Sequence, residues 1–386
     1  MGAGWRVNTR LLAALLSVVA LTAATAPARG EETLDWDPET TSVFVVGILE
    51  WERGDLWSSF PAAMVDRRDE QLVEFFREAG VPEERLVYLQ DSEATKAEIQ
   101  KELNDLLDET DEGELVIIYF AGHGYRDSDS GRTWFACYDA GDENSSGWGV
   151  REIFDAVEKR FSGDRALLLA DCCHSGALYD EARRRAPDSD VTYGVITSSY
   201  AHNTSTGNWT FTDSLLAGWR GEGAVDLNGD GSIELREMAR YCDLELAFIE
   251  GQKSMFYAAE EFPRGAALAE VEEEASPRVG ERVEVEWHGK WYRAKTIAAD
   301  GDQVQVHYNG FSAETDEWVG TERVRPYYPA EFGEGDRVEV EWDKDGKWYP
   351  ARILRGWYGL HKVRYDEDDA SSDEWVGPGK VRLRAE

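Results

Sequence analysis

Three short apolar runs limit what this chain can fold into more than any other feature does. Each has the length and composition typical of a strand buried on both faces of a sheet, and they span residues 41–48, 115–122 and 165–171. Apolar residues also recur at helical spacing between these runs, at 68–79, 94–109 and 149–160. This alternation predicts an α/β fold with a mostly parallel sheet flanked by helices. Ligand sites in such sheets gather at the carboxyl ends of the strands.

The composition allows a large core and argues against a nucleic-acid partner. Apolar residues make up 42% of the chain, which allows a substantial core. The length of 386 residues is enough for more than one domain. The formal net charge is -36, whereas a protein that binds phosphates needs an excess of Lys and Arg. Most of the carboxylates are expected to form a solvated acidic surface, which could also attract cations or basic peptides.

Residues 1–28 have the pattern of a secretory signal peptide. Arg6 and Arg10 precede an apolar run at 11–21, and an A-x-A site places the cleavage after Ala28. The run is too short to span a membrane, and no later segment is long enough. We therefore expect a secreted or periplasmic protein without a membrane span, with a retained anchor as the alternative.

Two of the four cysteines stand side by side at the end of an apolar run. Four cysteines are too few for a disulfide scaffold, and the adjacent pair lacks the spacing of a zinc site or a redox motif. Whether Cys137 and Cys242 pair depends on geometry and stays open. The run at 115–122 leads to His123, and the run at 165–171 leads to Cys173, 50 residues later. Both side chains should therefore emerge at the same edge of the sheet.

The segments "YFAGHG" (119–124) and "DCCHSG" (171–176) resemble the histidine and cysteine motifs of the metacaspases and of related bacterial caspase-like proteases. The resemblance covers about residues 42–265, and the spacing of the two motifs is also that of caspases. It implies acyl transfer, in which the Cys173 thiolate attacks a peptide carbonyl and His123 protonates the leaving amine. The backbone N–H groups of Cys173 and Gly124 are the expected oxyanion donors.

The residues beside the nucleophile are expected to pack or to hold the turn. Cys172 occupies the variable position of the motif, so we interpret it as a small packing residue. His174 lacks the spacing of a catalytic partner and is interpreted as structural.

The resemblance also implies a preference for Arg or Lys before the scissile bond. The acid two places before the cysteine, Asp171, would help form the S1 pocket and bind a cationic side chain by a charge-assisted hydrogen bond. Asp69 is a second candidate for this pocket, although a solvated helix surface is its favoured interpretation. Ala121 stands where many metacaspases have serine, which puts the polarity of the pocket in doubt. The run Arg183–Arg185 is expected in a solvated loop at 179–190, with a self-processing site as the less favoured alternative.

Residues 226–237, "DLNGDGSIELRE", fit the twelve-residue calcium loop of an EF-hand. The predicted oxygen ligands are Asp226, Asn228, Asp230, the carbonyl of Ser232, Glu234 and Glu237. No second loop accompanies this one, and an Asx-rich turn without metal is the alternative. Metacaspases are often activated by calcium, usually through other acidic sites. Whether calcium would activate or only stabilise this chain stays open.

Two copies of one small all-β unit follow a predicted linker at 266–278. They span 279–328 and 333–385, and "GERVEVEW" in the first recurs as "GDRVEVEW" in the second. The unit resembles an SH3-like or Tudor-like barrel, which often holds methylated lysine in an aromatic cage. The candidate cage residues are Trp287, Tyr308, Phe311 and Trp318 in the first copy and Trp342, Tyr365 and Trp375 in the second, where Asp368 replaces Phe311. A role in the barrel core is the favoured interpretation of these aromatics. In either case, the barrels are expected to dock a protein or cell-surface ligand.

Taken together, these patterns predict a caspase-like peptidase domain at 40–265 that needs no organic cofactor. The expected activity is that of a secreted cysteine endopeptidase, and calcium is the expected metal. A catalytically inactive caspase-like scaffold is one alternative. A calcium-dependent adhesion protein that acts through its barrels is another.

Overall fold

The computed structural model describes residues 36–386, except for 128, 144–145, 261, 266, 272–278, 328–331, 343–345, 358, 378–379 and 385–386. The predicted signal peptide therefore lies outside the described residues. Of the helices that are described, none combines the length and the apolar character that crossing a membrane requires.

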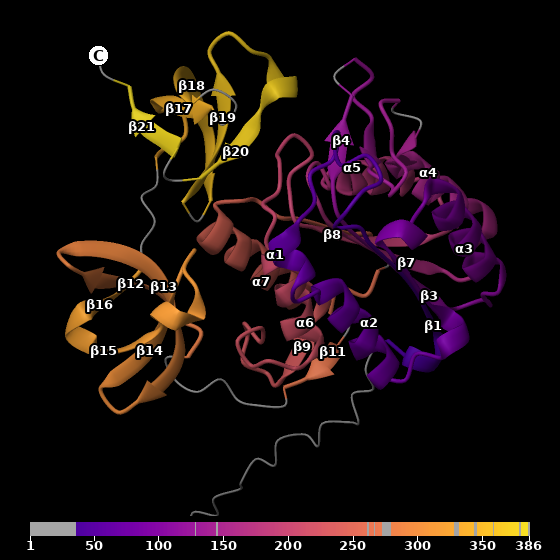
Figure 1. Cartoon of the computed structure of the whole chain (residues 1–386), viewed down its shortest axis with the longest axis horizontal. Coiled ribbons are helices and arrows are strands. Elements are labelled where there is room, and N and C mark those ends of the chain that lie inside the picture. Colours follow the sequence, from indigo (N-terminus) through magenta and orange to yellow (C-terminus); the bar gives the residue numbers. More distant parts are fainter. Residues whose placement is uncertain are drawn as a thin grey trace, which may run out of the picture. The chain divides into compact units, whose positions relative to one another are not determined.

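A six-stranded sheet forms the centre of the first domain (Figure 1). Its strand order is β10–β8–β7–β3–β1–β2. The parallel strands are β1 (Thr41–Gly47), β2 (Leu86–Gln90), β3 (Leu115–Ala121), β7 (Arg165–Asp171) and β8 (Thr192–Thr197). The edge strand β10 (Met255–Ala258) is antiparallel to β8. The predicted mostly parallel sheet is thus confirmed.

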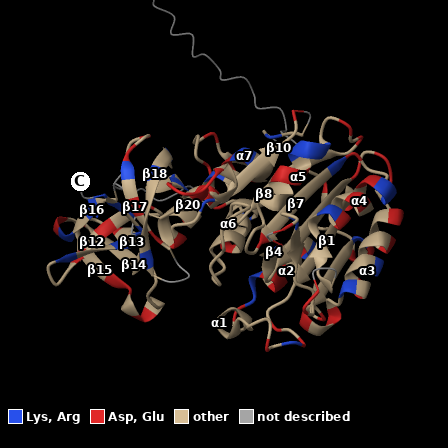
Figure 2. Ribbon diagram, turned by 90° about the horizontal axis from the view of Figure 1, so that it is seen from above, with Lys and Arg blue, Asp and Glu red and all other residues tan. Residues whose placement is uncertain are grey.

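Helices cover both faces of this sheet. One face carries α2 (Arg68–Glu78), α6 (Thr210–Trp219) and α7 (Leu235–Glu245), and the other carries α3 (Lys96–Asp108), α4 (Val150–Arg160) and α5 (Ala177–Arg185). Successive side chains of β3 alternate between the two cores, with Tyr119 in one and Phe120 in the other. A short helix, α1 (Pro61–Met64), lies before α2. The strands of the central sheet are mostly uncharged, whereas both signs of charge lie on the helices and loops (Figure 2).

Two small sheets complete this domain. The first, β4–β5–β6, follows β3 directly and consists of β4 (Gly124–Arg126), β5 (Thr133–Phe135) and β6 (Trp148–Gly149). The second pairs β9 (Ser232–Glu234) with β11 (Ala267–Glu270). The predicted linker at 266–278 is therefore wrong in its first part, because Leu268 is buried in the core shared with α6 and α7. Residues 272–278 lie outside the part that the structure describes.

The cysteines belong to separate parts of the core. All four are free thiols. Cys137 and Cys172 lie in the core on the α3–α4 face, and Cys242 lies in the core on the α6–α7 face. Because the sheet separates Cys137 from Cys242, the two do not pair. The packing role expected for Cys172 agrees with its 2% exposure.

Each repeat forms a five-stranded antiparallel barrel. The first consists of β12 (Arg282–Trp287), β13 (Lys290–Asp300), β14 (Gln303–Tyr308), β15 (Glu317–Gly320) and β16 (Val324–Pro326). The second consists of β17 (Arg337–Trp342), β18 (Lys347–Trp357), β19 (Leu360–Tyr365), β20 (Glu374–Val376) and β21 (Val381–Leu383). Valines supply most of the buried core in both.

Candidate active site

The register between β3 and β7 brings His123 and Cys173 to the same edge of the sheet. Ala121, the last residue of β3, pairs with Asp171, the last residue of β7. His123 and Cys173 each follow their strand by two residues. Because the strands are parallel, both side chains lie at the carboxyl end of the sheet, where ligand sites gather.

The imidazole of His123 is oriented by the segment that follows β1. Its Nε2 lies 2.8 Å from the carbonyl oxygen of Ser58. The ring packs against Trp51 and Phe60, with centroids 4.5 and 4.6 Å away. A carbonyl can only accept a hydrogen bond, so Nε2 carries the proton and Nδ1 keeps its lone pair. Burial lowers the pKa of His123, although the bond to Ser58 opposes this shift. The resting ring is therefore neutral, with Nδ1 as the proton acceptor.

The thiol of Cys173 is held by a loop distant in sequence. The backbone N–H of Ser205 donates to Cys173 Sγ over 3.1 Å. Burial raises the pKa of the Cys173 thiol, while the hydrogen bond with the Ser205 backbone opposes this effect. No hydrogen bond between Cys173 Sγ and His123 occurs among the described residues. Such contacts often tighten only when substrate binds, so the missing bond does not rule out this pair.

Gly124 packs directly against the backbone of Cys173. A Cβ atom at this position would overlap the carbonyl oxygen of Cys173. Only glycine permits this close approach. The predicted oxyanion residue thus lies next to Cys173, while its donor role stays a prediction.

Asp171 lines a small cavity beside His123. The cavity has a volume of about 30 Å³, and its walls include Phe60, Ala121 and residues 206–209. Asp171 Oδ2 accepts a hydrogen bond from the Thr212 hydroxyl over 2.8 Å. Burial raises the pKa of Asp171 to about 7, against the opposing hydrogen bonds. No Lys or Arg side chain in the described part of the chain forms an ion pair with it, so the carboxyl group has no permanent cationic partner.

Asp69 occupies a different environment from the one expected. Its side chain is fully buried and forms an ion pair with Arg67 over 2.7 Å. It also accepts a hydrogen bond from the Tyr88 hydroxyl over 2.9 Å. The solvated interpretation is therefore wrong, because Asp69 tucks against Gly47, which has no side chain to exclude it. Asp69 does not line the Asp171 cavity, and its ion-pair partner Arg67 also bonds Asp91 over 2.6 Å.

His174 closes the turn after the nucleophile. Its φ is 59°, and its N–H donates to the Asn203 carbonyl over 3.0 Å. Its Nδ1 lies 3.1 Å from the carbonyl oxygen of Ala201. These contacts agree with the structural role expected for His174.

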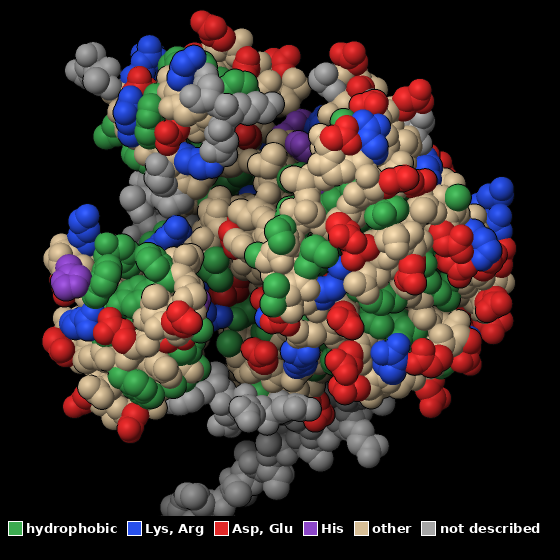
Figure 3. Space-filling model, viewed as in Figure 1, with side chains coloured by type: hydrophobic (Ala, Val, Ile, Leu, Met, Phe, Trp, Pro, Cys, Tyr) green, Lys and Arg blue, Asp and Glu red, His purple; other side chains and the backbone are tan. Residues whose placement is uncertain are grey.

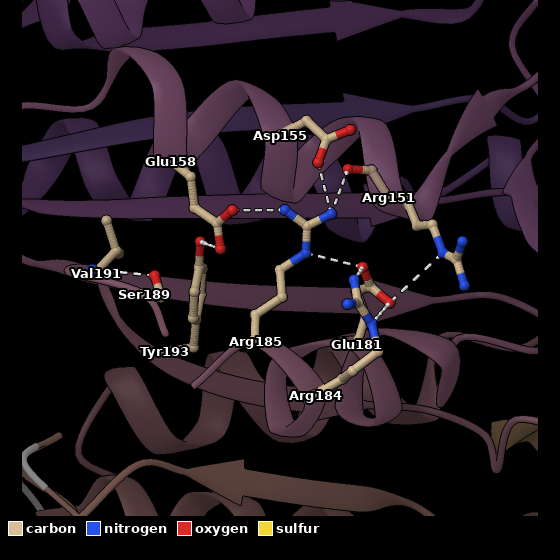
Figure 4. Close-up of polar contacts among 9 residues, drawn as sticks. All are labelled: Arg151, Asp155, Glu158, Glu181, Arg184, Arg185, Ser189, Val191 and Tyr193. Atoms are coloured by element: carbon tan, nitrogen blue, oxygen red, sulfur yellow. Dashed lines mark hydrogen bonds and ion pairs between the residues drawn. The ribbon is translucent and has the colours of Figure 1, made fainter. Parts of the chain in front are cut away.

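The arginine run lies in a helix rather than in a loop. Arg183, Arg184 and Arg185 form the last turn of α5. Figure 4 shows Arg185 between α4 and α5, where it bonds to Asp155, Glu158 and Glu181 over 2.6, 2.6 and 2.8 Å. The loop prediction is wrong because these carboxylates pair the charges that suggested solvation. A bond inside this paired helical turn is poorly placed for proteolysis.

The loop at 226–237 is folded around its own carboxylates. Asp226 accepts hydrogen bonds from the N–H groups of Gly229 and Gly231, and Glu237 accepts from that of Asn228 over 3.0 Å. All the predicted ligand atoms are oxygens, as calcium requires. However, Glu234 forms an ion pair with Arg236. Among the described residues, no three His, Cys, Asp or Glu side chains are gathered as a metal site. The other predicted ligands, Asp226, Asn228, Asp230, Ser232 and Glu237, fit calcium better than Glu234 does.

The first barrel gathers four aromatic rings at the edge of its core, where Tyr308 is buried, as expected for a core residue, and Tyr292 packs against the core. Trp287, Tyr292, Tyr308 and Phe311 lie with ring centroids 5.7–6.4 Å apart. Trp287 and Phe311 are about half exposed, so a role in the core is wrong for both. Figure 3 likewise shows apolar side chains at the surface of this barrel. Trp318 does not join the group. Neighbouring side chains of a strand point to opposite faces, and Glu317, the residue before Trp318, accepts a hydrogen bond from the Tyr308 hydroxyl, so Trp318 points away from Tyr308. Tyr292 was not predicted.

The second barrel has an aromatic cavity with an acidic rim. Its volume is about 560 Å³, and its lining includes Trp342, Tyr349, Tyr365, Asp366, Asp368 and Glu374. Trp375 lies elsewhere and is buried beside Leu360. Tyr349 is the third aromatic residue of the cavity, beside Trp342 and Tyr365, and it was not predicted from the sequence.

Three contributors to the candidate site were not predicted from the sequence. Ser58 acts through its carbonyl, Ser205 acts through its N–H, and Thr212 holds Asp171 from α6. Backbone groups are the same for nearly every residue type. All three residues lie on segments remote from both motifs.

Comparisons with known proteins agree with this architecture. Residues 63–260 match the caspase domain family, and residues 280–329 and 335–386 each match the Agenet domain family. The first match covers half of the chain, which therefore belongs to the caspase family of cysteine peptidases and carries two C-terminal, Tudor-like Agenet domains.

Several individual proteins are similar to parts of this chain. Metacaspase-4 of Arabidopsis thaliana is 30% identical over 122 residues, which are 28% of this chain and 28% of that protein. A solved structure of protein GSU0716 from Geobacter sulfurreducens aligns with 60% of this chain and 100% of its own, at 13% identity and a TM-score of 0.43. A pair of Agenet domains from Arabidopsis thaliana AGDP1 aligns with 28% of this chain and 81% of its own, at 19% identity and a TM-score of 0.14.

Proposed function

We propose that this chain is a cysteine endopeptidase in which Cys173 is the nucleophile and His123 moves the proton. The observation that carries this proposal is the register of β3 and β7, which sets the two side chains at one sheet edge. His123 Nδ1 accepts the thiol proton, and the thiolate attacks the scissile carbonyl. The imidazolium then protonates the leaving amine as the C–N bond breaks. Water, activated by the neutral imidazole, hydrolyses the thioester and restores the thiol.

The residues around the pair support these steps. Ser58, Trp51 and Phe60 hold the imidazole so that Nδ1 is the reacting nitrogen. The N–H of Ser205 would stabilise the thiolate after proton transfer.

The proposed substrate has Arg or Lys before the scissile bond. Asp171 is a half-buried carboxyl without a cationic partner among the described residues, and it lines the cavity next to His123. A bound guanidinium would supply the missing charge and lower the pKa of Asp171. The cavity is small, so residues 206–209 must move outward to admit such a side chain. Replacing Asp171 with Asn should lower kcat/KM for an Arg peptide by about 10–100-fold, as expected for a lost charged hydrogen bond.

The remaining features suggest how such an enzyme works outside the cell. The sequence pattern of residues 1–28 supports secretion or delivery to the periplasm. Calcium is proposed as a ligand of the 226–237 loop. The aromatic residues of both barrels and the acidic residues around the cavity of the second suit cationic side chains, including methylated lysine, so we propose docking to basic segments of a protein or cell-surface partner.

One experiment tests the central proposal. The mature chain is incubated with fluorogenic peptides that end in Arg or Asp, with calcium and with chelator. Cleavage of the Arg peptide should disappear in Cys173→Ala. The matched control, Cys172→Ala, removes the neighbouring buried thiol and should retain activity. If the wild type and Cys173→Ala are equally silent under every condition, the inactive scaffold becomes the better description.

A further inference from the structure

A second cavity lies next to the dyad and away from Asp171. Its volume is about 270 Å³, and it is enclosed by the β4–β5 hairpin, the first turn of α4 and one side of α5. Asp171 is bonded from α6, on the opposite face of the sheet from α4 and α5. The two cavities share no lining residue.

This second cavity adjoins the reacting groups. Its lining includes Arg126, three residues after His123, and Ala177, four residues after Cys173. The carbonyl of Ala201, also in the lining, lies 3.4 Å from Arg126 Nη1 and 3.1 Å from His174 Nδ1. The strand that follows His123 and the helix that follows Cys173 therefore both contribute to the wall of this cavity.

The lining carries more positive than negative charge, although the whole chain has a net charge of -36. Its cations are Arg126, Arg132, Arg151 and Arg184, and its anions are Glu152, Asp180 and Glu181. Two of the anions are already paired with cations outside the lining. Glu181 bonds Arg185 over 2.8 Å, and Glu152 bonds Lys96 over 3.1 Å.

Two of the arginines form no ion pair with an acidic side chain that the structure describes, although Asp180 lies close enough to Arg126 for their charges to interact. Arg126 donates to neutral acceptors, the Ala201 carbonyl and His202 Nδ1, the latter over 2.7 Å. Burial, followed by the nearby Arg126 charge, lowers the pKa of His202 to about 4, so this ring is neutral. Arg132 forms no ion pair with any acidic side chain that the structure describes. Arg132 in particular can therefore take an anion.

The proposed reaction fixes which part of a substrate meets this cavity. With the basic side chain in the Asp171 cavity, the leaving amine lies at His123, which protonates it. The segment after the scissile bond then continues past β4, the strand that begins directly after His123.

We infer that the arginine-lined cavity binds a carboxylate side chain in the first few residues after the scissile bond. The enzyme would thus select substrates in which a basic residue is followed closely by an acidic one. This inference rests on the proposed peptidase function, because that function gives the direction of the bound chain.

Matched peptides test this preference. Two internally quenched peptides share an Arg before the scissile bond and differ only in carrying Asp or Asn at the three following positions. The ratio of kcat/KM for Asp over Asn should be about 5–10 in the wild type, as expected for about 1 kcal/mol of charge pairing. Arg132→Gln should bring the ratio close to one. Arg183→Gln also removes one positive charge, but from a residue of α5 outside the cavity, and it should keep the wild-type ratio.

Binding provides a second readout that does not require turnover. In a Cys173→Ala background, the intact Asp peptide should bind more tightly than the Asn peptide, and the difference should shrink at high salt. Equal binding of the two peptides, or equal effects of Arg132→Gln and Arg183→Gln, would overturn the inference. If the Asn peptide is still cleaved after Arg, the peptidase proposal survives that result. If no peptide is cleaved, the peptidase proposal fails. The binding of the Asp and Asn peptides then decides alone whether the cavity takes a carboxylate.

Discussion

Asp171 shows at the scale of one residue how a binding group can weaken the fold. Its carboxyl group is buried with hydroxyl donors, and its pKa of about 7 lies above its ordinary value of 3.8. The folded chain therefore binds this proton more tightly than the unfolded chain does. By linkage, the contribution of Asp171 is most favourable below pH 4 and is lost progressively as the pH rises toward 7.

Replacing Asp171 with Asn should therefore stabilise the chain at high pH. The amide oxygen can still accept from Thr212, and the amide carries no charge that burial disfavours. We expect the free energy of unfolding of Asp171→Asn to exceed that of the wild type by about 1–3 kcal/mol at pH 8, with a smaller difference at pH 5. Urea unfolding at both pH values measures this. A difference that does not grow with pH would contradict the assignment.

The sequence identifies those candidate site residues that lie in a motif at the end of a strand. His123, Cys173 and Asp171 follow or end β3 and β7, so the apolar runs place them at the sheet edge. The partners that orient them, Ser58 and Ser205, act through backbone atoms, which leave no trace in residue type. Asp69 is buried in an ion pair with Arg67, and the spacing of the two residues in the sequence does not predict this contact.

At the scale of elements, α5 depends on the charges at its last turn. Arg185 is 11% exposed and joins α5 to two acids of α4 (Figure 4). Arg185→Gln should lower the free energy of unfolding by about 1–3 kcal/mol, because it leaves the partly buried Glu181 with fewer partners. Arg183→Gln should change stability by less than about 0.5 kcal/mol. Thermal or urea unfolding of the two variants provides the comparison, and equal effects would rule out this role of Arg185.

The loop at 226–237 lies between α6 and α7, so an ion bound there should stabilise that pair of helices. Calcium is expected to raise the Tm of the full chain by several degrees, since it binds the folded state only. Glu237→Gln should remove most of the shift. Glu222→Gln, an exposed change before the loop, should keep it. A wild-type Tm that calcium leaves unchanged would favour the Asx-rich turn without metal.

Strands were predictable where burial on both faces of the sheet makes their sequence a continuous apolar run. The predicted runs match β1 and β3 to within one residue and β7 at both ends. The errors concern segments whose composition conflicts with their environment. The Arg-rich end of α5 is held by α4, and β11 is a short strand rich in alanine that pairs with β9. In both, tertiary contacts overrode local composition.

At the scale of the whole molecule, a peptidase domain and two barrels with aromatic surfaces share one chain. The cavity of the second barrel should bind a trimethyl-lysine peptide through Trp342. In a full-length Cys173→Ala chain, Trp342→Ala should weaken this binding about fivefold or more. Trp348→Ala is the control, because Trp348 stacks with Arg382 outside the cavity. Fluorescence anisotropy measures both, and an equal loss in the two variants would contradict the assignment.

The four free thiols have a practical consequence for counting active molecules. Cys137, Cys172 and Cys242 are almost completely enclosed, whereas Cys173 is only partly covered. A small alkylating reagent should therefore label the native chain once, and all four sites only after denaturation. Mass spectrometry reads the stoichiometry directly, and a second adduct on native protein would show that the core opens. One reagent would then titrate competent enzyme in any preparation, without knowledge of its natural substrate.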